Sequence, residues 1–257
     1  PAPHRTNGHS VVTALAALTE RSLQSSVRDG GLVFETASPV LYLAGFSAAL
    51  HGLIETGEMS YQQYLVPGVV VQSMIFVALF NADRAARDRH IRFSERLRTM
   101  PISTSAPVAA RLAATLARAA LILSVALIAG YAFGFRMTGG FGYFLAFVAM
   151  ALLLCLAVAL GSDALGSSVN SAQGAAYLLF VPQLLLFMLS TGIAPEQTFP
   201  NWLRPFVRNQ PVSQVAETLR GLATSHVAMP NLAVSLTWCL GMVLIFGAIT
   251  LRLQRRS

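Results

Sequence analysis

Six long apolar stretches dominate this sequence and limit what it can fold into. Each is nearly free of charge and close to the roughly 20 residues that a helix needs to cross a lipid bilayer. A helix satisfies its backbone hydrogen bonds within one segment, as a chain in lipid must. The sequence therefore predicts an all-α, polytopic membrane protein. It forms a single transmembrane domain, residues 1–257, with spans at about residues 32–54, 64–82, 107–135, 141–166, 172–194 and 232–251.

Charged residues make up only 11% of the chain, against about 25% in an ordinary soluble domain. This shortage argues against a water-soluble enzyme. All 18 basic residues are arginine. Without lysine the chain cannot form a P-loop or a Schiff base. If the function needs ATP, we therefore expect a separate polypeptide to hydrolyse it, and we expect no cofactor in this chain.

The arginines gather on one side of the predicted spans. Twelve of them fall in the N-terminal segment, the loop between spans two and three, and the C-terminal tail. An even number of spans puts these segments on the same side, and positively charged short loops stay in the cytoplasm. We therefore expect both termini in the cytoplasm. Membrane orientation accounts for the net charge of +7, so we expect no nucleic-acid partner.

Catalytic and metal-binding patterns are not evident in the sequence. Cys155 and Cys239 lie far apart in apolar runs, and there is no His-Glu-x-x-His motif or carboxylate cluster. An intramembrane serine hydrolase would need a base on a facing helix, but Ser47 and His51 share one predicted helix. We expect no catalytic residue and no metal site. The stronger alternative is a proton-coupled secondary transporter, which would need a mid-depth acid that no predicted span carries.

Two segments outside the spans predict helices at the membrane surface. Residues 10–29 have the apolar spacing of an amphipathic helix on the cytoplasmic side. Residues 195–225 predict external helices that are too short to cross the bilayer, so they should lie in or dip into the outer leaflet. Their apolar face is formed by Phe199, Trp202, Leu203 and Phe206. These side chains are either interface anchors or a cap over an exit path for an amphiphile.

The most charged segment is the cytoplasmic loop between spans two and three. Residues 86–101 predict a helix that ends at Pro101. Among its arginines runs a narrow apolar stripe at helical spacing, formed by Phe93, Leu97 and Met100. The stripe suits insertion into a groove on another protein, or the loop is a solvated basic segment that touches anionic lipid. The spacing alone leaves both interpretations open.

Ionisable side chains inside the membrane are candidates for function, because leaving one unpaired costs at least a few kcal/mol. Arg118 falls within span three, and Asp163 falls near the cytoplasmic end of the antiparallel span four. We expect these two residues to form an ion pair. Glu35 and His51, near the two ends of span one, are expected to reach the membrane interface.

The order of these segments, together with two motifs, resembles one known family. The first motif is the loop Glu95-Arg96-Leu97-Arg98-Thr99-Met100-Pro101-Ile102-Ser103, which is similar to a Glu-Arg-Leu-x-x-x-Pro-x-Ser loop. The second is the external run Phe199-Pro200-x-Trp202-Leu203-x-Pro205-Phe206. Both resemble permease subunits of type-2 ABC exporters, particularly the daunorubicin-resistance-like actinobacterial branch. The resemblance covers nearly the whole chain.

The resemblance implies partners and a substrate class. In that family the loop helix docks on the nucleotide-binding subunit, so the stripe becomes a docking surface: Phe93, Leu97 and Met100, with Glu95 and Arg96 as polar partners. It implies ATPase subunits that bind ATP and Mg²⁺, and a second permease subunit, identical or homologous. It also implies export of an amphiphile, either a hydrophobic drug or a complex envelope lipid, across the bacterial cytoplasmic membrane.

Overall fold

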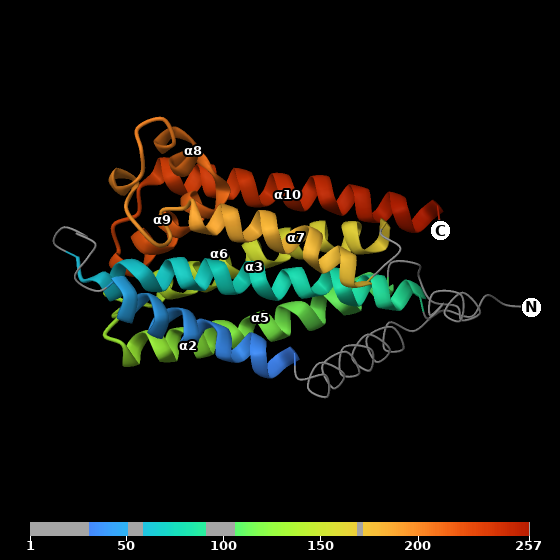
Figure 1. Ribbon diagram of the computed structural model, residues 1–257, viewed down its shortest axis with the longest axis horizontal. Helices are drawn as coiled ribbons and strands as arrows, with labels where there is room; N and C mark the ends of the chain where they lie inside the picture. The colour runs from blue at the N-terminus through green and yellow to red at the C-terminus, as the bar shows by residue number, and fades with distance from the viewer. Residues whose placement is uncertain (1–30, 51–58, 91–105, 169–171, 257) are drawn as a thin grey trace, which may run out of the picture.

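The protein is a bundle of long helices (Figure 1). The computed structural model describes residues 31–50, 59–90, 106–168 and 172–256. Its long helices are α2 (Gly31–Leu50), α3 (Tyr61–His90), α5 (Ala106–Ala132), α6 (Phe141–Ser168), α7 (Ala172–Met188) and α10 (Met229–Arg256). Three short helices connect α7 to α10: the 3-10 helix η1 (Glu196–Thr198), α8 (Arg204–Asn209) and α9 (Pro211–Thr224). The all-α class is confirmed for these residues.

Within the described residues, five helices are long and apolar enough to cross a membrane. These candidate spans are Gly31–Ala49, Tyr61–Ala82, Val108–Ala132, Phe141–Gly166 and Met229–Thr250. The predicted span at 172–194 corresponds to α7, which ends at Met188 after 17 residues and is about 25 Å long. Residues 189–194 form a turn instead of a helix. The hydroxyl of Ser190 stabilises this turn, because it donates to the Phe187 carbonyl at 2.7 Å.

Helix α3 is the centre of the bundle. It contacts α2, α5, α6, α7 and α9, and 94% of its membrane-length window is buried. The consecutive residues Val69, Val70 and Val71 are all fully buried, as expected for a helix with neighbours on every side. The helix also continues past the predicted end of span two, from Ala82 to His90. Span two and the beginning of the charged loop are therefore one continuous helix.

Small residues let neighbouring backbones approach α3 closely at both ends of its buried part. A Cβ atom at Gly68 would overlap the backbone of Gly192, in the turn that follows α7. A Cβ atom at Gly166, near the end of α6, would overlap the carbonyl of Ala82. These two contacts hold α3 against α6 and against the turn after α7.

The outer helices present apolar side chains on the surface of the bundle. Only 11% of the membrane-length window of α10 is buried, and only 22% of that of α2. Exposed fractions reach 70% for Val33, 71% for Ile128 and 72% for Leu244. Apolar surface on this scale is unusual in a water-soluble monomer, but it suits contact with lipid or with another membrane subunit.

The second predicted external helix, α9, packs into the bundle. Of the 14 residues of α9, 10 are buried, and the helix packs on α3, α6 and α10. Val215 and Leu219, which form part of its apolar face, are fully buried. The amphipathic spacing is thus real, and its apolar face meets the other helices. The position of α9 relative to the outer leaflet stays a prediction.

Two predicted cytoplasmic features lie outside the described residues. They are the surface helix at residues 10–29 and the docking residues Phe93 to Pro101. Of the predicted loop helix at 86–101, residues 86–90 are the last residues of α3. The surface helix and the docking surface therefore stay predictions.

Candidate functional site

An ionic cluster lies inside the bundle, near the end where α10 finishes (Figure 1). Its residues come from the beginning of α2, the first half of α5 and the last buried turns of α3 and α6. One ion pair of this cluster joins α5 to α6, since Arg111 Nη2 and Nε lie 2.8 and 2.9 Å from Asp163 Oδ1. Asp163 is fully buried, whereas the Arg111 side chain is 13% exposed.

A second ion pair joins α5 to α2. Arg118 Nε lies 3.6 Å from Glu35 Oε2, and both side chains are almost fully buried. Arg118 Nη2 also donates to Thr115 Oγ1 at 3.0 Å, and that hydroxyl lies 3.2 Å from Asn81 Oδ1. Asn81 Nδ2 donates to the Ala159 carbonyl at 3.2 Å. The ionic cluster of Glu35, Asn81, Arg111, Thr115, Arg118 and Asp163 therefore ties α2, α3, α5 and α6 together.

The predicted ion-pair residues are thus both buried and both paired. Asp163 has Arg111 as a partner, and Arg118 has Glu35, so a direct Arg118–Asp163 pair stays a prediction. The expectation that Glu35 reaches the membrane interface is wrong, because its side chain is fully buried. The charge of Arg118 makes that burial tolerable, since a buried carboxylate needs a paired cation.

The ionic cluster has the properties of a structural clamp. Its two arginines and two carboxylates carry no net charge, so four ionised groups are accommodated inside an apolar bundle. Each ion pair has one partner on α5, so both depend on the rotation and depth of that helix. The arrangement can therefore hold four helices in one relative position at this end of the bundle.

A buried amide pair connects α3 to α7 between the two ends of the bundle. Gln183 Nε2 donates to Gln72 Oε1 at 2.8 Å, and the two residues are 6% and 1% exposed. Gln183 directly follows Pro182, which has no backbone N–H to donate within α7. The side-chain bond therefore attaches α7 to the centre of the bundle where its own hydrogen bonding is interrupted.

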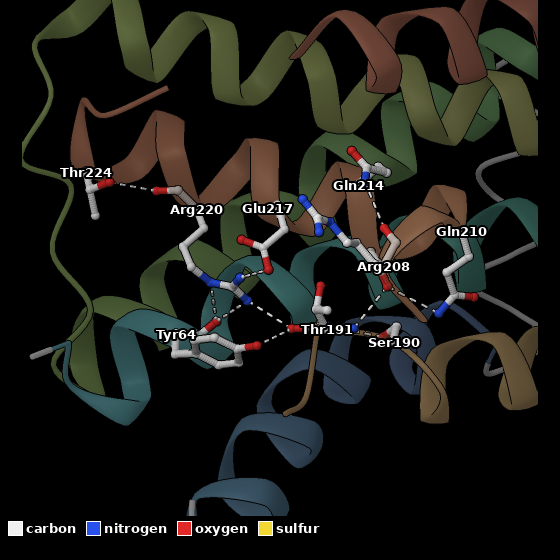
Figure 2. A network of polar contacts seen from close by, with 11 residues as sticks. Tyr64, Ser190, Thr191, Arg208, Gln210, Gln214, Glu217, Arg220 and Thr224 are labelled. Carbon is white, nitrogen blue, oxygen red and sulfur yellow. Dashed lines mark hydrogen bonds and ion pairs between the residues drawn. The ribbon is translucent and has the colours of Figure 1, made fainter. Parts of the chain in front are cut away.

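A second polar cluster, the α9 cluster, lies at the opposite end of the bundle and is centred on Arg220 (Figure 2). Arg220 Nη2 donates to the carbonyls of Tyr64 and Thr191 at 3.2 and 3.1 Å, and Nη1 lies 2.7 Å from Glu217 Oε1. The guanidinium carbon stands 3.7 Å from the centre of the Tyr64 ring. The Tyr64 hydroxyl donates to the Thr191 carbonyl at 2.7 Å. Arg220 thus joins α9, α3 and the turn after α7.

Hydroxyl and amide groups at the beginning of α9 extend this cluster (Figure 2). Ser213 Oγ accepts from the Thr191 backbone N–H at 3.0 Å and from Gln210 Nε2 at 3.2 Å. Gln214 Nε2 donates to the Arg208 carbonyl at 2.8 Å. The turn after α7 and the end of α8 are therefore held by side chains of α9, which supply the hydrogen bonds that a helix would otherwise provide.

Local sequence signals set the two ends of α9. Pro211 occupies the first turn, where its fixed φ suits a helix and its missing N–H costs nothing. At the other end Ser225 adopts a left-handed conformation with φ of 60°, and the His226 N–H donates to the Gly221 carbonyl at 3.0 Å. The helix is consequently short, and it turns the chain back into α10.

A pocket of about 410 Å³ adjoins the α9 cluster, and we call it the α9 pocket. Its volume falls in the range of small-ligand sites. In Figure 2 the Arg208 side chain points toward Glu217, another residue of the pocket. In the described part of the chain, no three His, Cys, Asp or Glu side chains gather as metal ligands would. The polar walls come from the turn after α7, from η1, and from α8, α9 and α10: Thr191, Glu196, Arg208, Gln214, Glu217 and Asn231.

The predicted external apolar face is divided between different environments. Trp202 is 79% exposed and Phe206 is 49% exposed, whereas Val207 is fully buried. Phe199 and Leu203 are half-buried. The face is not one helix, because Phe199 is extended after η1 and α8 begins only after Leu203. The interpretation of these side chains as interface anchors or as an exit cap stays a prediction.

Sequence reasoning missed the central residue of the α9 cluster. Arg220 is not among the candidate functional residues that the sequence predicts. A signal was present, because Glu217 and Arg220 are three residues apart on a helix and their neighbours Ala216 and Leu219 are apolar. Opposite charges at this spacing on a helix can pair, and the Arg220 side chain is 7% exposed whereas that of Glu217 is 36% exposed. The buried pair Gln72 and Gln183 gave no comparable signal.

Comparisons with known proteins agree with the resemblance seen in the sequence. Residues 13–224 match the family model described as ABC-2 type transporter. The chain is 30% identical over 254 residues to the doxorubicin resistance ABC transporter permease protein DrrB of Mycobacterium tuberculosis, covering 93% of this chain and 88% of that protein. It is 27% identical over 222 residues to the daunorubicin resistance ABC transporter permease protein DrrB1 of Streptomyces coeruleorubidus, covering 85% and 77%. Because the family match extends over most of its length, this chain belongs to the ABC-2 type transporter family.

Proposed function

We propose that this protein is the membrane-spanning permease subunit of an ATP-driven exporter that moves an amphiphile, a hydrophobic drug or an envelope lipid, out of the cytoplasm or the inner leaflet. It crosses the bacterial cytoplasmic membrane six times, with α7 as the fifth span and both termini in the cytoplasm. It works beside a second permease subunit, identical or homologous. ATPase subunits in the same complex bind ATP and Mg²⁺ and perform the hydrolysis, so this chain makes and breaks no bond.

One observation carries the proposal: the family match covers residues 13–224, and relatives of similar length are permeases named for resistance to doxorubicin and daunorubicin. The absence of lysine supports the division of labour, because a P-loop ATPase needs that side chain. The net positive charge of the tail and of the loop after α3 supports a cytoplasmic position for that end of the bundle.

The geometry suggests how movement of an ATPase would reach the transport path. Helix α3 runs without interruption from Tyr61 to His90, so its far end leads directly into the loop with the proposed docking residues. Its buried part contacts five other helices. A displacement of the loop would therefore move the centre of the bundle. The ionic cluster at the same end would make α2, α5 and α6 follow α3 as one unit.

We expect Leu97→Asp to reduce the ATPase that co-purifies with the tagged permease at least tenfold, as measured by quantitative mass spectrometry. A carboxylate forced into an apolar groove costs several kcal/mol, and about 1.4 kcal/mol is enough for a tenfold loss. Thr99→Asp is the matched control, because it adds the same charge to the same loop on the opposite helical face. If Leu97→Asp and Thr99→Asp retained the ATPase equally, the stripe would not be the docking surface.

A further inference from the structure

Two residues that line the α9 pocket carry buried polar atoms that the protein leaves unsatisfied. Thr191 Oγ1 and Gln214 Oε1 have no hydrogen-bond partner among the described residues. Both residues line the pocket, and they are only 4% and 8% exposed. Their other polar atoms are engaged, since the Thr191 N–H is bound by Ser213 and Gln214 Nε2 by the Arg208 carbonyl. Buried acceptors without partners are unfavourable unless something else supplies the missing hydrogen bonds.

The ionised groups of the pocket balance one another. Glu196 and Glu217 are opposed by Arg208 and Arg220, which gives a formal charge of zero. One oxygen of Glu217 is bound to Arg220, whereas Arg208 extends toward the same region (Figure 2). A ligand with a full negative charge would meet two carboxylates, and a ligand with a full positive charge would meet two guanidinium groups. This composition favours an uncharged ligand with many groups that both donate and accept hydrogen bonds.

An apolar stripe leads away from the pocket along α10. Asn231 lines the pocket, and Val234, Trp238 and Ile245 follow it at spacings of 3, 7 and 14 residues, which place them on one helical face. These three side chains are 41%, 44% and 60% exposed. A polar head in the pocket would therefore have an uncovered apolar surface beside it for its hydrocarbon chain.

The geometry points to the α9 pocket as a binding site for the hydroxyl-rich, uncharged head of an amphiphile, of which a sugar headgroup is the representative chemistry. A side-chain rotation that turns Thr191 Oγ1 and Gln214 Oε1 to the pocket surface lets them accept from ligand hydroxyls, and the Arg208 guanidinium donates to the same ligand. The hydrocarbon part lies along Val234, Trp238 and Ile245. The inference deepens the proposed function, on which it rests, because it identifies the substrate class as glycolipid-like and places its head at the α9 end of the bundle.

Three probes with the same octyl chain test this assignment: octyl glucoside, octyl phosphate and octylamine, each below its critical micelle concentration. The protein is purified in nanodiscs with the subunits that accompany it, and the shift of its unfolding temperature with probe concentration gives a dissociation constant. We expect octyl glucoside to bind most tightly. Thr191→Val should raise the dissociation constant of octyl glucoside about three- to tenfold, which is the effect of one lost hydrogen bond.

Thr191→Val removes only an unpartnered hydroxyl, so we expect its unfolding temperature without probe to equal or exceed that of the wild type. Thr237→Val is the matched control, since its hydroxyl bonds only to Ala233 of its own helix α10 and lies outside the pocket. Glu196→Gln is the second variant, and it remains informative if Thr191→Val fails to fold. It leaves the pocket with one excess positive charge, so octyl phosphate should then gain affinity relative to octyl glucoside.

The inference is overturned if octyl phosphate or octylamine binds the wild type as tightly as octyl glucoside. It is also overturned if octyl glucoside binds Thr191→Val and Thr237→Val equally, or if Glu196→Gln leaves the order of the probes unchanged. Co-purification of the ATPase is recorded on the same samples. If the ATPase is present and the protein does not bind octyl glucoside more tightly than the other two probes, only the headgroup assignment fails. If no ATPase accompanies the protein, the proposed function fails whatever the probes do.

Discussion

Asp163→Asn should lower the free energy of unfolding by about 3 kcal/mol, because it removes the charge of the buried carboxylate that pairs with the Arg111 guanidinium. Asp163 is fully buried at the junction of α5 and α6, where water cannot easily replace the lost carboxylate. The expected result is a clearly earlier transition when the purified protein is unfolded in mixed detergent micelles. Transport should fall as well, since α5 and α6 would no longer be held together at this end.

The double variant Arg111→Gln/Asp163→Asn is the control for this prediction. It removes both charges and leaves two amides that can bond to each other. Neutral groups can often replace a buried ion pair with little loss of stability. We therefore expect the double variant to recover more than half of the stability lost in Asp163→Asn. If the single and double variants were equally unstable, the loss would come from packing, and the ion pair would not be the clamp that the geometry suggests.

Arg220→Met should lower the free energy of unfolding by about 3–5 kcal/mol and release α9 from the bundle. The arginine supplies hydrogen bonds to two backbone carbonyls, an ion pair with Glu217 and a stacking contact with the Tyr64 ring. Methionine fills similar space but satisfies none of these groups. Hydrogen–deuterium exchange should show faster exchange of backbone amides in α9 and at Thr191, which are otherwise protected by this cluster.

Arg204→Met is the matched control for Arg220→Met. Arg204 also donates to two backbone carbonyls, those of Phe199 and Gln197, but at a site that is partly exposed to solvent. We expect its loss to cost about 1 kcal/mol or less and to leave exchange in α9 unchanged. Comparable effects of the two substitutions would contradict the central position assigned to Arg220.

The positions of the long helices could be predicted from hydropathy, because a helix in lipid must be apolar over most of its length. The same rule cannot show how a short amphipathic helix is used. The spacing of Val215, Leu219 and Leu222 is identical whether α9 lies on a membrane or packs into a bundle. Only the positions of α3, α6 and α10 decide between them, and those are set by contacts far apart in the sequence.

For a similar reason, the sequence could not predict which acidic residue of the ionic cluster pairs with which arginine. Arg111 and Arg118 lie two turns apart on one face of α5, so either could meet an acid on a neighbouring helix. The choice depends on the depth of α2, which brings Glu35 beside Arg118 and leaves Asp163 within reach of Arg111. The sequence predicted that Arg118 and Asp163 lie inside the bundle, but it could not identify the residues that pair with them.

ATP-driven transport in proteoliposomes tests the central claim most directly. The complex that co-purifies with this chain is reconstituted with a fluorescent amphiphile, and movement across the bilayer is followed with ATP, with ATP and vanadate, and with a protonophore. We expect transport that requires ATP, stops with vanadate and continues when the proton gradient is collapsed. Transport that needs no ATP and stops with the protonophore would contradict this claim and would indicate a proton-coupled carrier.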